Sequence, residues 1–92
     1  MKQLEIFYLS RCPYCRNAMK AIEELKDENL EYSDIGIRWI EESEEPEIAD
    51  SRDYYNVPAV FFNGEKLYEA KPFHDYDTIK AGIKGAFDTA LR

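Results

Sequence analysis

The sequence predicts an α/β fold in which a mixed sheet of four strands is flanked by three helices, in the order β-α-β-α-β-β-α. Apolar segments of strand length alternate with segments whose apolar residues recur every three to four positions, as on one face of a helix. Asn63-Gly64 separates two short apolar stretches, which is the strongest local signal for a tight hairpin. The 92 residues, 45% of them hydrophobic, suffice for one modest core, so we expect a single domain over residues 1–92.

The first strand and the first helix are expected to meet near residue 12. Residues 4–9 are apolar and aromatic with little helical period, which predicts a strand buried on both faces. Pro13 suits the first turn of a helix, where its missing amide hydrogen would have had no partner. Ala18, Ile22 and Leu25 recur at helical spacing and predict an amphipathic helix with one buried side.

A second strand is expected at residues 30–35, after a break at Asn29, with Leu30 and Tyr32 facing the core. Strand, helix and strand in that order imply a right-handed parallel crossover. Trp39 and Ile40 are expected to anchor the following segment to the core, although an isolated tryptophan also suits a partner-binding role.

Negative charge is concentrated in residues 41–47, around Pro46. This pattern predicts the entry and first turn of a second helix that runs to about Tyr54. An acidic docking surface is the functional alternative, but blocks of charge are most often solvent-facing.

The last three elements are a hairpin and a closing helix. Residues 57–62 and 66–68 flank the Asn-Gly turn, so these two strands are expected to be antiparallel. Ile79, Ile83 and Phe87 recur every four residues and predict a helix that begins after residue 75. Gly82 and Gly85 either weaken this helix locally or permit close packing against the sheet.

The charge balance limits the classes of partner. Twelve basic against 19 acidic residues give a net charge of −7, which repels phosphate backbones and anionic membrane surfaces, so neither nucleic acid nor a membrane is expected as a partner. Met1-Lys2-Gln3 does not resemble the start of a signal peptide, and no apolar run approaches membrane-spanning length. We therefore expect a cytoplasmic location, where a close pair of cysteines is seldom a permanent structural bridge.

The two cysteines of the chain lie in the run Ser10-Arg11-Cys12-Pro13-Tyr14-Cys15, at the expected junction of strand and helix. A thiolate attacks disulfides, whereas a thiol does so poorly. The amino end of a helix and the neighbouring Arg11 both favour a negatively charged sulfur at Cys12. The run therefore predicts thiol chemistry. Arg11 has two further interpretations, as a ligand for a substrate carboxylate or as a solvated side chain.

With these motifs in place the chain resembles the glutaredoxins, a branch of the thioredoxin-like fold. The resemblance spans nearly the whole chain and rests on Cys12-Pro13-Tyr14-Cys15, on Val57-Pro58 and on Phe61-Phe62-Asn63-Gly64. It implies a dithiol-disulfide oxidoreductase that reduces protein disulfides or glutathione mixed disulfides.

The resemblance also implies roles for individual residues. Cys12 would attack and form a mixed disulfide with the substrate, and Cys15 would resolve it. Pro58 would be cis, with the backbone of Val57 presented to a substrate peptide. A plain strand start is the alternative interpretation of this dipeptide.

Five residues are expected to contact the substrate. They are Arg11, Pro13, Tyr14, Val57 and Pro58. We expect no metal and no tightly bound cofactor, with glutathione as a possible co-substrate. The expected partners are disulfide-containing proteins or glutathione, together with a thiol reductant or a reductase, and the protein is expected to be a monomer.

The sequence departs from the family pattern where glutathione would bind. Asn56 replaces the usual threonine before Val-Pro, and residues 67–72 lack the usual Gly-Gly pair and the acidic residues after it. Glu69 is expected to repel a glutathione carboxylate, and Arg11, Arg52 or Lys71 could compensate. The dithiol chemistry is therefore better supported than the choice of glutathione.

Two alternative functions remain open. One is a thioredoxin-like electron carrier that a flavoprotein reductase reduces without glutathione. The other is a module that binds zinc or an iron-sulfur cluster, which would need a dimer or outside thiols because one cysteine pair is half of a four-sulfur site.

Other candidate side chains are interpreted as structural. The only histidine, His74, is expected at the surface or at a helix entry rather than as a catalytic base. Tyr54-Tyr55 is expected to pack beside the Val57-Pro58 loop, with a recognition surface as the alternative. Tyr14 is expected either to line the approach to the sulfur or to cover the helix start.

Overall fold

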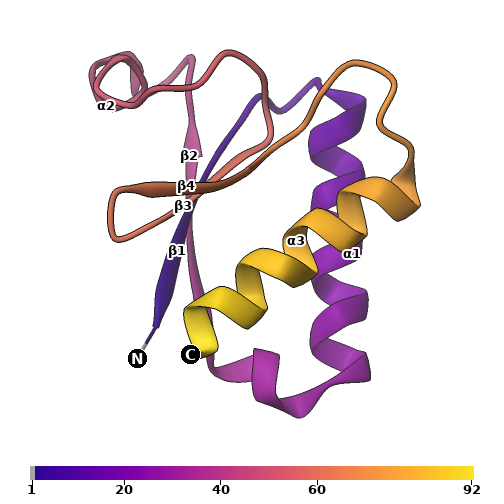
Figure 1. Ribbon diagram of the computed structural model, residues 1–92. Helices are drawn as coiled ribbons and strands as arrows, with labels where there is room; N and C mark the ends of the chain where they lie inside the picture. Colours follow the sequence, from indigo (N-terminus) through magenta and orange to yellow (C-terminus); the bar gives the residue numbers. More distant parts are fainter. Residues whose placement is uncertain (1) are drawn as a thin grey trace.

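The computed structural model describes residues 2–92, and Met1 of the amino-terminal segment considered above lies outside them. Its elements follow the chain in the order β1 (Gln3–Tyr8), α1 (Pro13–Glu28), a 3-10 helix η1 (Leu30–Asp34), β2 (Gly36–Glu41), α2 (Pro46–Asp50), β3 (Ala59–Phe62), β4 (Glu65–Glu69) and α3 (Tyr76–Leu91) (Figure 1).

The strands form one mixed sheet in the order β2-β1-β3-β4. Strand β1 pairs with β2 in parallel and with β3 antiparallel, and β3 pairs with β4 antiparallel. The predicted four-stranded mixed sheet and the parallel crossover are confirmed. Among residues 2–92, the structure has no helix with the length and apolar character needed to span a bilayer.

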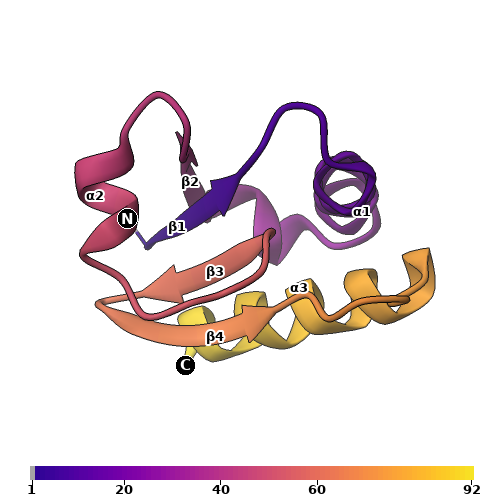
Figure 2. The same cartoon turned by 90° about the horizontal axis from the view of Figure 1, so that it is seen from above.

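Helices cover both faces of the sheet. Figure 1 shows α1 and α3 on one face and α2 on the other, and in the turned view of Figure 2 α1 and α2 lie on opposite sides. Leu4 and Ile6 of β1 belong to the larger core under α1 and α3, whereas Phe7 belongs to a smaller core with Ala49 of α2. The expectation that the first strand is buried on both faces is confirmed.

Each long helix begins where local chemistry permits. Pro13 occupies the first turn of α1, as predicted, and Ala18, Ile22 and Leu25 are buried on one side. Helix α3 is capped by Asp75, whose carboxylate accepts a hydrogen bond from the Thr78 amide at 2.8 Å.

The predicted second strand is wrong in position. Residues 30–34 form the 3-10 helix η1, and the strand begins only at Gly36. The Asn29 side chain accepts a hydrogen bond from the Glu31 amide, and the Ser33 hydroxyl donates to the Leu30 carbonyl, so local bonds satisfy the backbone without a sheet partner. Tyr32 is buried as expected, but Leu30 is 82% exposed.

Helix α2 is shorter than predicted, and the segment before it agrees with the prediction. The second helix begins at Pro46 as expected but ends at Asp50, short of the predicted end near Tyr54. Trp39 and Ile40 lie on β2, with Ile40 fully buried and Trp39 packed against the larger core, so their predicted anchoring is confirmed.

The hairpin and the closing helix agree with the sequence. Asn63 and Gly64 both have positive φ, 51° and 84°, as a tight hairpin turn between β3 and β4 requires. In α3, a Cβ atom added at Gly82 would lie 2.3 Å from the Tyr68 ring, so Gly82 permits close packing of helix on strand. Gly85 has nothing within 4 Å of such an atom.

Candidate active site

Cys12 lies at the amino end of α1, as the N-cap residue. Its carbonyl accepts hydrogen bonds from the amides of Cys15 and Arg16, both at 3.1 Å, and its own amide donates to the Leu9 carbonyl at 3.1 Å. The half-buried side chain is thereby held beside the positive end of the helix dipole.

The Val57-Pro58 loop faces this sulfur. The peptide bond between the two residues is cis, as predicted, and Pro58 is buried. The Cys12 Sγ lies 3.8 Å from the Val57 carbonyl oxygen, within reach of a weak S–H···O hydrogen bond. The fold therefore brings together two motifs that are 45 residues apart in the sequence.

The second cysteine lies behind the first. Both cysteines are free thiols, and Cys15 is only 1% exposed. Burial raises the pKa of Cys15 from 9.0 to about 12, and the neighbouring Cys12 and the charge of Glu42 add to the effect. The half-buried Cys12 and the buried Cys15 therefore differ sharply in their access to solvent.

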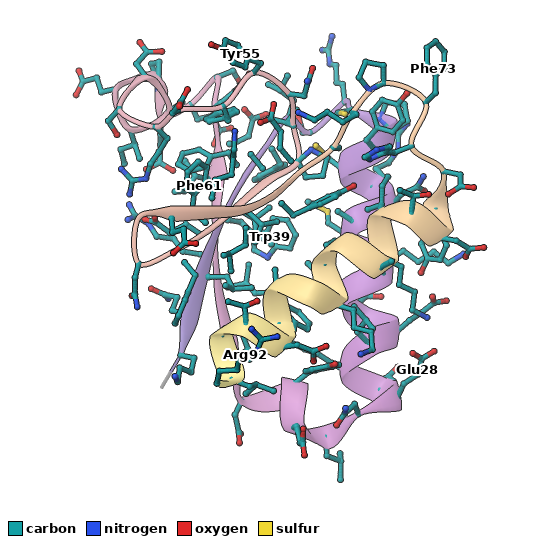
Figure 3. All side chains as sticks on the ribbon, viewed as in Figure 1. Glu28, Trp39, Tyr55, Phe61, Phe73 and Arg92 are labelled. Atoms are coloured by element: carbon teal, nitrogen blue, oxygen red, sulfur yellow. The ribbon has the colours of Figure 1, made fainter. Side chains whose placement is uncertain are left out.

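A shallow pocket of about 280 Å³ opens over Cys12. Its lining residues are Leu9, Cys12, Tyr14, Glu42, Tyr55, Asn56, Val57, Ala70, Lys71 and Pro72. Figure 3 shows Tyr55 and Phe73 at the same end of the molecule. Tyr55 lines the pocket and is 88% exposed, and Phe73, whose amide donates to the Tyr14 hydroxyl, is 94% exposed, so two exposed aromatic rings lie at or near the pocket.

The predicted substrate-contacting residues divide into two groups. Tyr14 and Val57 line the pocket. Arg11 and Pro13 are exposed beside it without lining it, and Pro58 is buried behind the loop. Tyr14 also accepts a hydrogen bond from the Phe73 amide at 2.9 Å, so its hydroxyl ties the first turn of α1 to the segment before α3.

Glu69 has a place that the sequence did not reveal. Its carboxylate is buried, accepts hydrogen bonds from the amides of Tyr55 and Asn56 at 3.0 and 2.8 Å, and pairs with Lys66 at 2.7 Å. Burial alone would raise the pKa of Glu69, but Lys66 and the two amides outweigh it and lower the pKa to about 2. Contrary to expectation, Glu69 presents no free charge to the pocket, whereas Lys71 lines it.

Glu41 is a second buried carboxylate that sequence reasoning missed. It lies at the end of β2 and accepts hydrogen bonds from the Ser10 amide at 3.1 Å and from the Ser43 amide and hydroxyl at 2.7 and 2.6 Å. The hydroxyl and amide of Ser43, together with the amide of Ser10, lower the pKa of Glu41 to about 2. No sequence motif marks either carboxylate, because the Ser10 amide that Glu41 binds and the Tyr55 and Asn56 amides that Glu69 binds are distant along the chain.

His74 and Tyr54 make packing and hydrogen-bond contacts outside the pocket, whereas Tyr55 is exposed. His74 Nδ1 lies 3.0 Å from the Tyr68 hydroxyl and accepts from the Lys71 amide at 3.2 Å, and His74 does not line the pocket, in agreement with the non-catalytic interpretation. Tyr54 packs on Phe7, with ring centroids 5.0 Å apart, so the expected packing is confirmed for Tyr54 but not for the exposed Tyr55.

The glutaredoxin family model matches residues 4–67. The chain belongs to the glutaredoxin family. Membership of this family supports a general thiol-disulfide oxidoreductase activity for the chain. No curated protein matches the sequence. Within residues 2–92, no three or more His, Cys, Asp or Glu side chains are grouped in a way that suits a metal ion.

Solved structures similar to this glutaredoxin-family chain share its thioredoxin-like fold. A point mutant of a thioredoxin from Halobacterium salinarum NRC-1 is 22% identical, with 98% of this chain and 74% of that chain covered and a TM-score of 0.61. Thioredoxin 1 from Thermosipho africanus TCF52B is 16% identical, with 98% and 99% covered and a TM-score of 0.60. A structure described as a malarial protein is 15% identical, with 89% and 92% covered and a TM-score of 0.60.

Proposed function

We propose that the protein is a dithiol oxidoreductase that reduces disulfides of polypeptides or mixed disulfides with glutathione. Cys12 is the attacking thiol and Cys15 the resolving thiol. One observation carries the proposal: the half-buried Cys12 Sγ lies in a pocket at a helix amino end, 3.8 Å from the Val57 carbonyl of a cis-proline loop.

The exchange balances in two steps. The Cys12 thiolate attacks one sulfur of the substrate disulfide, forms a mixed disulfide and releases the other substrate sulfur as a thiolate. The Cys15 thiolate then attacks the Cys12 sulfur and releases the second substrate thiol. The protein is left with a Cys12–Cys15 disulfide, and the substrate has gained two electrons and two protons. An external dithiol or two monothiol molecules return the protein to the reduced form.

The burial of Cys15 orders these steps. A thiol that is 1% exposed, with a pKa raised by burial to about 12, does not compete with Cys12 for an incoming disulfide. It acts once the Cys12 sulfur has become the neighbouring electrophile.

The rim of the pocket favours polypeptide substrates. Val57 offers its backbone to an extended segment, and the exposed rings of Tyr55 on the pocket rim and of Phe73 beside Tyr14 offer apolar contact area. A polypeptide segment can contact the loop and both rings, and we infer that these contacts contribute to its affinity.

A thioredoxin-like electron carrier is the second candidate, and the segment after β4 favours it. The amides of Lys71 and Phe73 donate to the His74 ring and to the Tyr14 hydroxyl, so they are already engaged within the protein. The glycine pair expected of glutathione-binding relatives is absent from residues 67–72. A flavoprotein reductase is therefore retained as the alternative source of electrons.

Cysteine variants test the mechanism directly. Cys12→Ser is expected to abolish turnover, because no attacking sulfur remains. Cys15→Ser is expected to retain the attack and to accumulate a mixed disulfide with a disulfide-bearing polypeptide, visible by intact-mass spectrometry and cleaved by dithiothreitol. Full multiple-turnover activity of Cys15→Ser on an intramolecular protein disulfide would contradict the dithiol mechanism.

The reductant is identified by a comparison on the oxidised wild-type protein. Its reduction is followed with glutathione in one arm and with a thioredoxin reductase and NADPH in the other. Rapid reduction by glutathione alone supports the first candidate, and rapid reduction by the reductase alone supports the electron carrier. The zinc or iron-sulfur alternative is tested by metal analysis of anaerobically purified protein.

A further inference from the structure

The charged side chains that are buried in residues 2–92 are two carboxylates, Glu41 and Glu69, which are 8% and 7% exposed. Acidic side chains are seldom buried unless they are paired or hydrogen-bonded. Both of these bind backbone amides of a loop that meets the Cys12 pocket. The two loops are different, and together they carry the sulfur and the carbonyl that face each other across the site.

Glu69 binds the loop that precedes the cis-proline. One carboxylate oxygen accepts from the amides of Tyr55 and Asn56, at 3.0 and 2.8 Å, and from the Asn56 side chain at 3.4 Å. Those residues lie directly before Val57 and outside any strand or helix. The other oxygen is held by Lys66 at 2.7 Å. The Tyr55 and Asn56 amides have no neighbouring strand to accept their hydrogen bonds, and the Glu69 carboxylate accepts them instead.

Glu41 binds the other loop. One of its oxygens accepts from the Ser10 amide, two residues before Cys12, at 3.1 Å. The other accepts from the Ser43 amide and hydroxyl. Strand β1 ends at Tyr8 and α1 begins at Pro13, so the intervening residues have no ladder partner of their own.

We propose that Glu41 and Glu69 are positioning residues that act through these loops. Glu41 holds the loop that places the Cys12 sulfur, and Glu69 holds the loop that presents the Val57 backbone. The Cys12 Sγ and the Val57 carbonyl oxygen, 3.8 Å apart, belong to two different loops. Because Glu41 holds one loop and Glu69 the other, the distance between these atoms depends on both carboxylates. Neither carboxylate touches the substrate or the reacting sulfurs.

The two residues are expected to affect different kinetic quantities. Loss of Glu69 loosens the Val57 loop, so it weakens substrate binding and affects the sulfur only through the 3.8 Å contact with the Val57 carbonyl. Loss of Glu41 loosens the sulfur itself, so it changes the reaction of Cys12 with any electrophile, however small. A purely structural role predicts no such separation, because it lowers stability without distinguishing the two quantities.

The test compares Glu69→Gln and Glu41→Gln with Glu65→Gln, a matched control at an exposed position of β4. Three quantities are measured: the KM for a disulfide-containing peptide, the rate of Cys12 alkylation by iodoacetamide, and the thermal midpoint. Glu69→Gln is expected to raise KM about tenfold and to leave alkylation within about twofold, since misplaced contacts cost roughly this much. Glu41→Gln is expected to change alkylation at least about threefold and to leave KM within about twofold.

A further variant separates the ion pair from the backbone hydrogen bonds. Lys66→Met removes the 2.7 Å ion pair of Glu69 and leaves its longer contact with Lys71, at 3.9 Å, and its bonds to the Tyr55 and Asn56 amides. It is expected to lower the thermal midpoint with a smaller rise in KM than Glu69→Gln. Equal effects of the two glutamine variants on both kinetic quantities, or a loss of thermal stability alone, overturn the proposal.

Hydrogen exchange on the wild-type protein gives an answer even where a variant does not fold. The amides of Ser10, Tyr55 and Asn56 are expected to exchange more slowly than the amide of Asp53, which is exposed and lies outside any helix or strand. Exchange of all three at the rate of Asp53 overturns the proposal. The kinetic arm rests on the proposed function and the exchange arm does not, so failure of the two can be told apart.

Discussion

Alkylation of Cys15 measures how far burial suppresses the second thiol. In the variant Cys12→Ser, Cys15 is the only cysteine, and burial, the largest cause of its raised pKa, remains. The wild-type pKa of about 12 includes contributions from the Cys12 thiol that the variant lacks, so the rise above 9.0 lowers the thiolate fraction at neutral pH by at most about 1000-fold. The more basic thiolate recovers a factor of roughly 15 to 30 in intrinsic nucleophilicity. Ionisation alone therefore slows alkylation by at most about 30- to 60-fold, and the 1% exposure slows it further.

The assay follows the mass increase of the folded variant with iodoacetamide, beside the same variant unfolded in urea. Because the raised pKa favours the neutral thiol, the rate of the folded protein should be low at neutral pH and should keep rising up to about pH 11. The unfolded chain should level off near the ordinary pKa of a thiol. A folded rate equal to the unfolded rate at neutral pH, or one that levels off near the ordinary thiol pKa, would refute the assignment of Cys15 as a buried, protonated thiol.

Three further measurements test the packing, the acidic loop contact and the rim. Gly82→Ala should destabilise the protein by about 1–2 kcal/mol in urea unfolding, because crowding outweighs the gain in helix propensity, whereas Gly85→Ala should stabilise it by about 0.5–1 kcal/mol. Equal stabilities would contradict the packing. Since the folded-state pKa of Glu69 is about 2, below its ordinary 4.5, its stabilisation is present above about pH 4.5 and is lost as the pH falls toward 2, so Glu69→Gln should show a shallower acid loss. Tyr55→Ala and Phe73→Ala should each lower kcat/KM for a disulfide protein about tenfold and leave a small disulfide such as hydroxyethyl disulfide unaffected; equal losses on both substrates would refute a docking role.

The parts of the fold that local chemistry determines were predictable. The Asn63-Gly64 turn requires positive φ at both positions, and Pro13 belongs at a helix start, so the sequence indicates both elements correctly. The second strand was misplaced because residues 30–35 have a pattern compatible with a strand, while side-chain hydrogen bonds from Asn29 and Ser33 stabilise a 3-10 turn instead. Competition of that kind depends on geometry, and the pattern of apolar residues does not reveal it.

The candidate site was predictable in its sulfurs and its proline and not in its supports. Cys12 and Val57 were identified by motif, and the fold brings them together. The place of Glu69 was misjudged, because a glutamate near a carboxylate-binding segment suggests repulsion unless its partners are known. Those partners are a lysine three residues away on the same strand and backbone amides 13 and 14 residues away, and only tertiary structure brings the amides into contact.

The outer strands of the sheet restrict where another chain can pair with it. Strands β2 and β4 are the two borders, and each turns charge outward, with exposed Arg38 on β2 and exposed Glu65 and Lys66 on β4. Charged side chains on the outer strands oppose pairing with a strand of another chain, because such pairing would remove water from the charged groups. We therefore expect an extended substrate of the proposed oxidoreductase to pair with the backbone beside Cys12 rather than with either border strand.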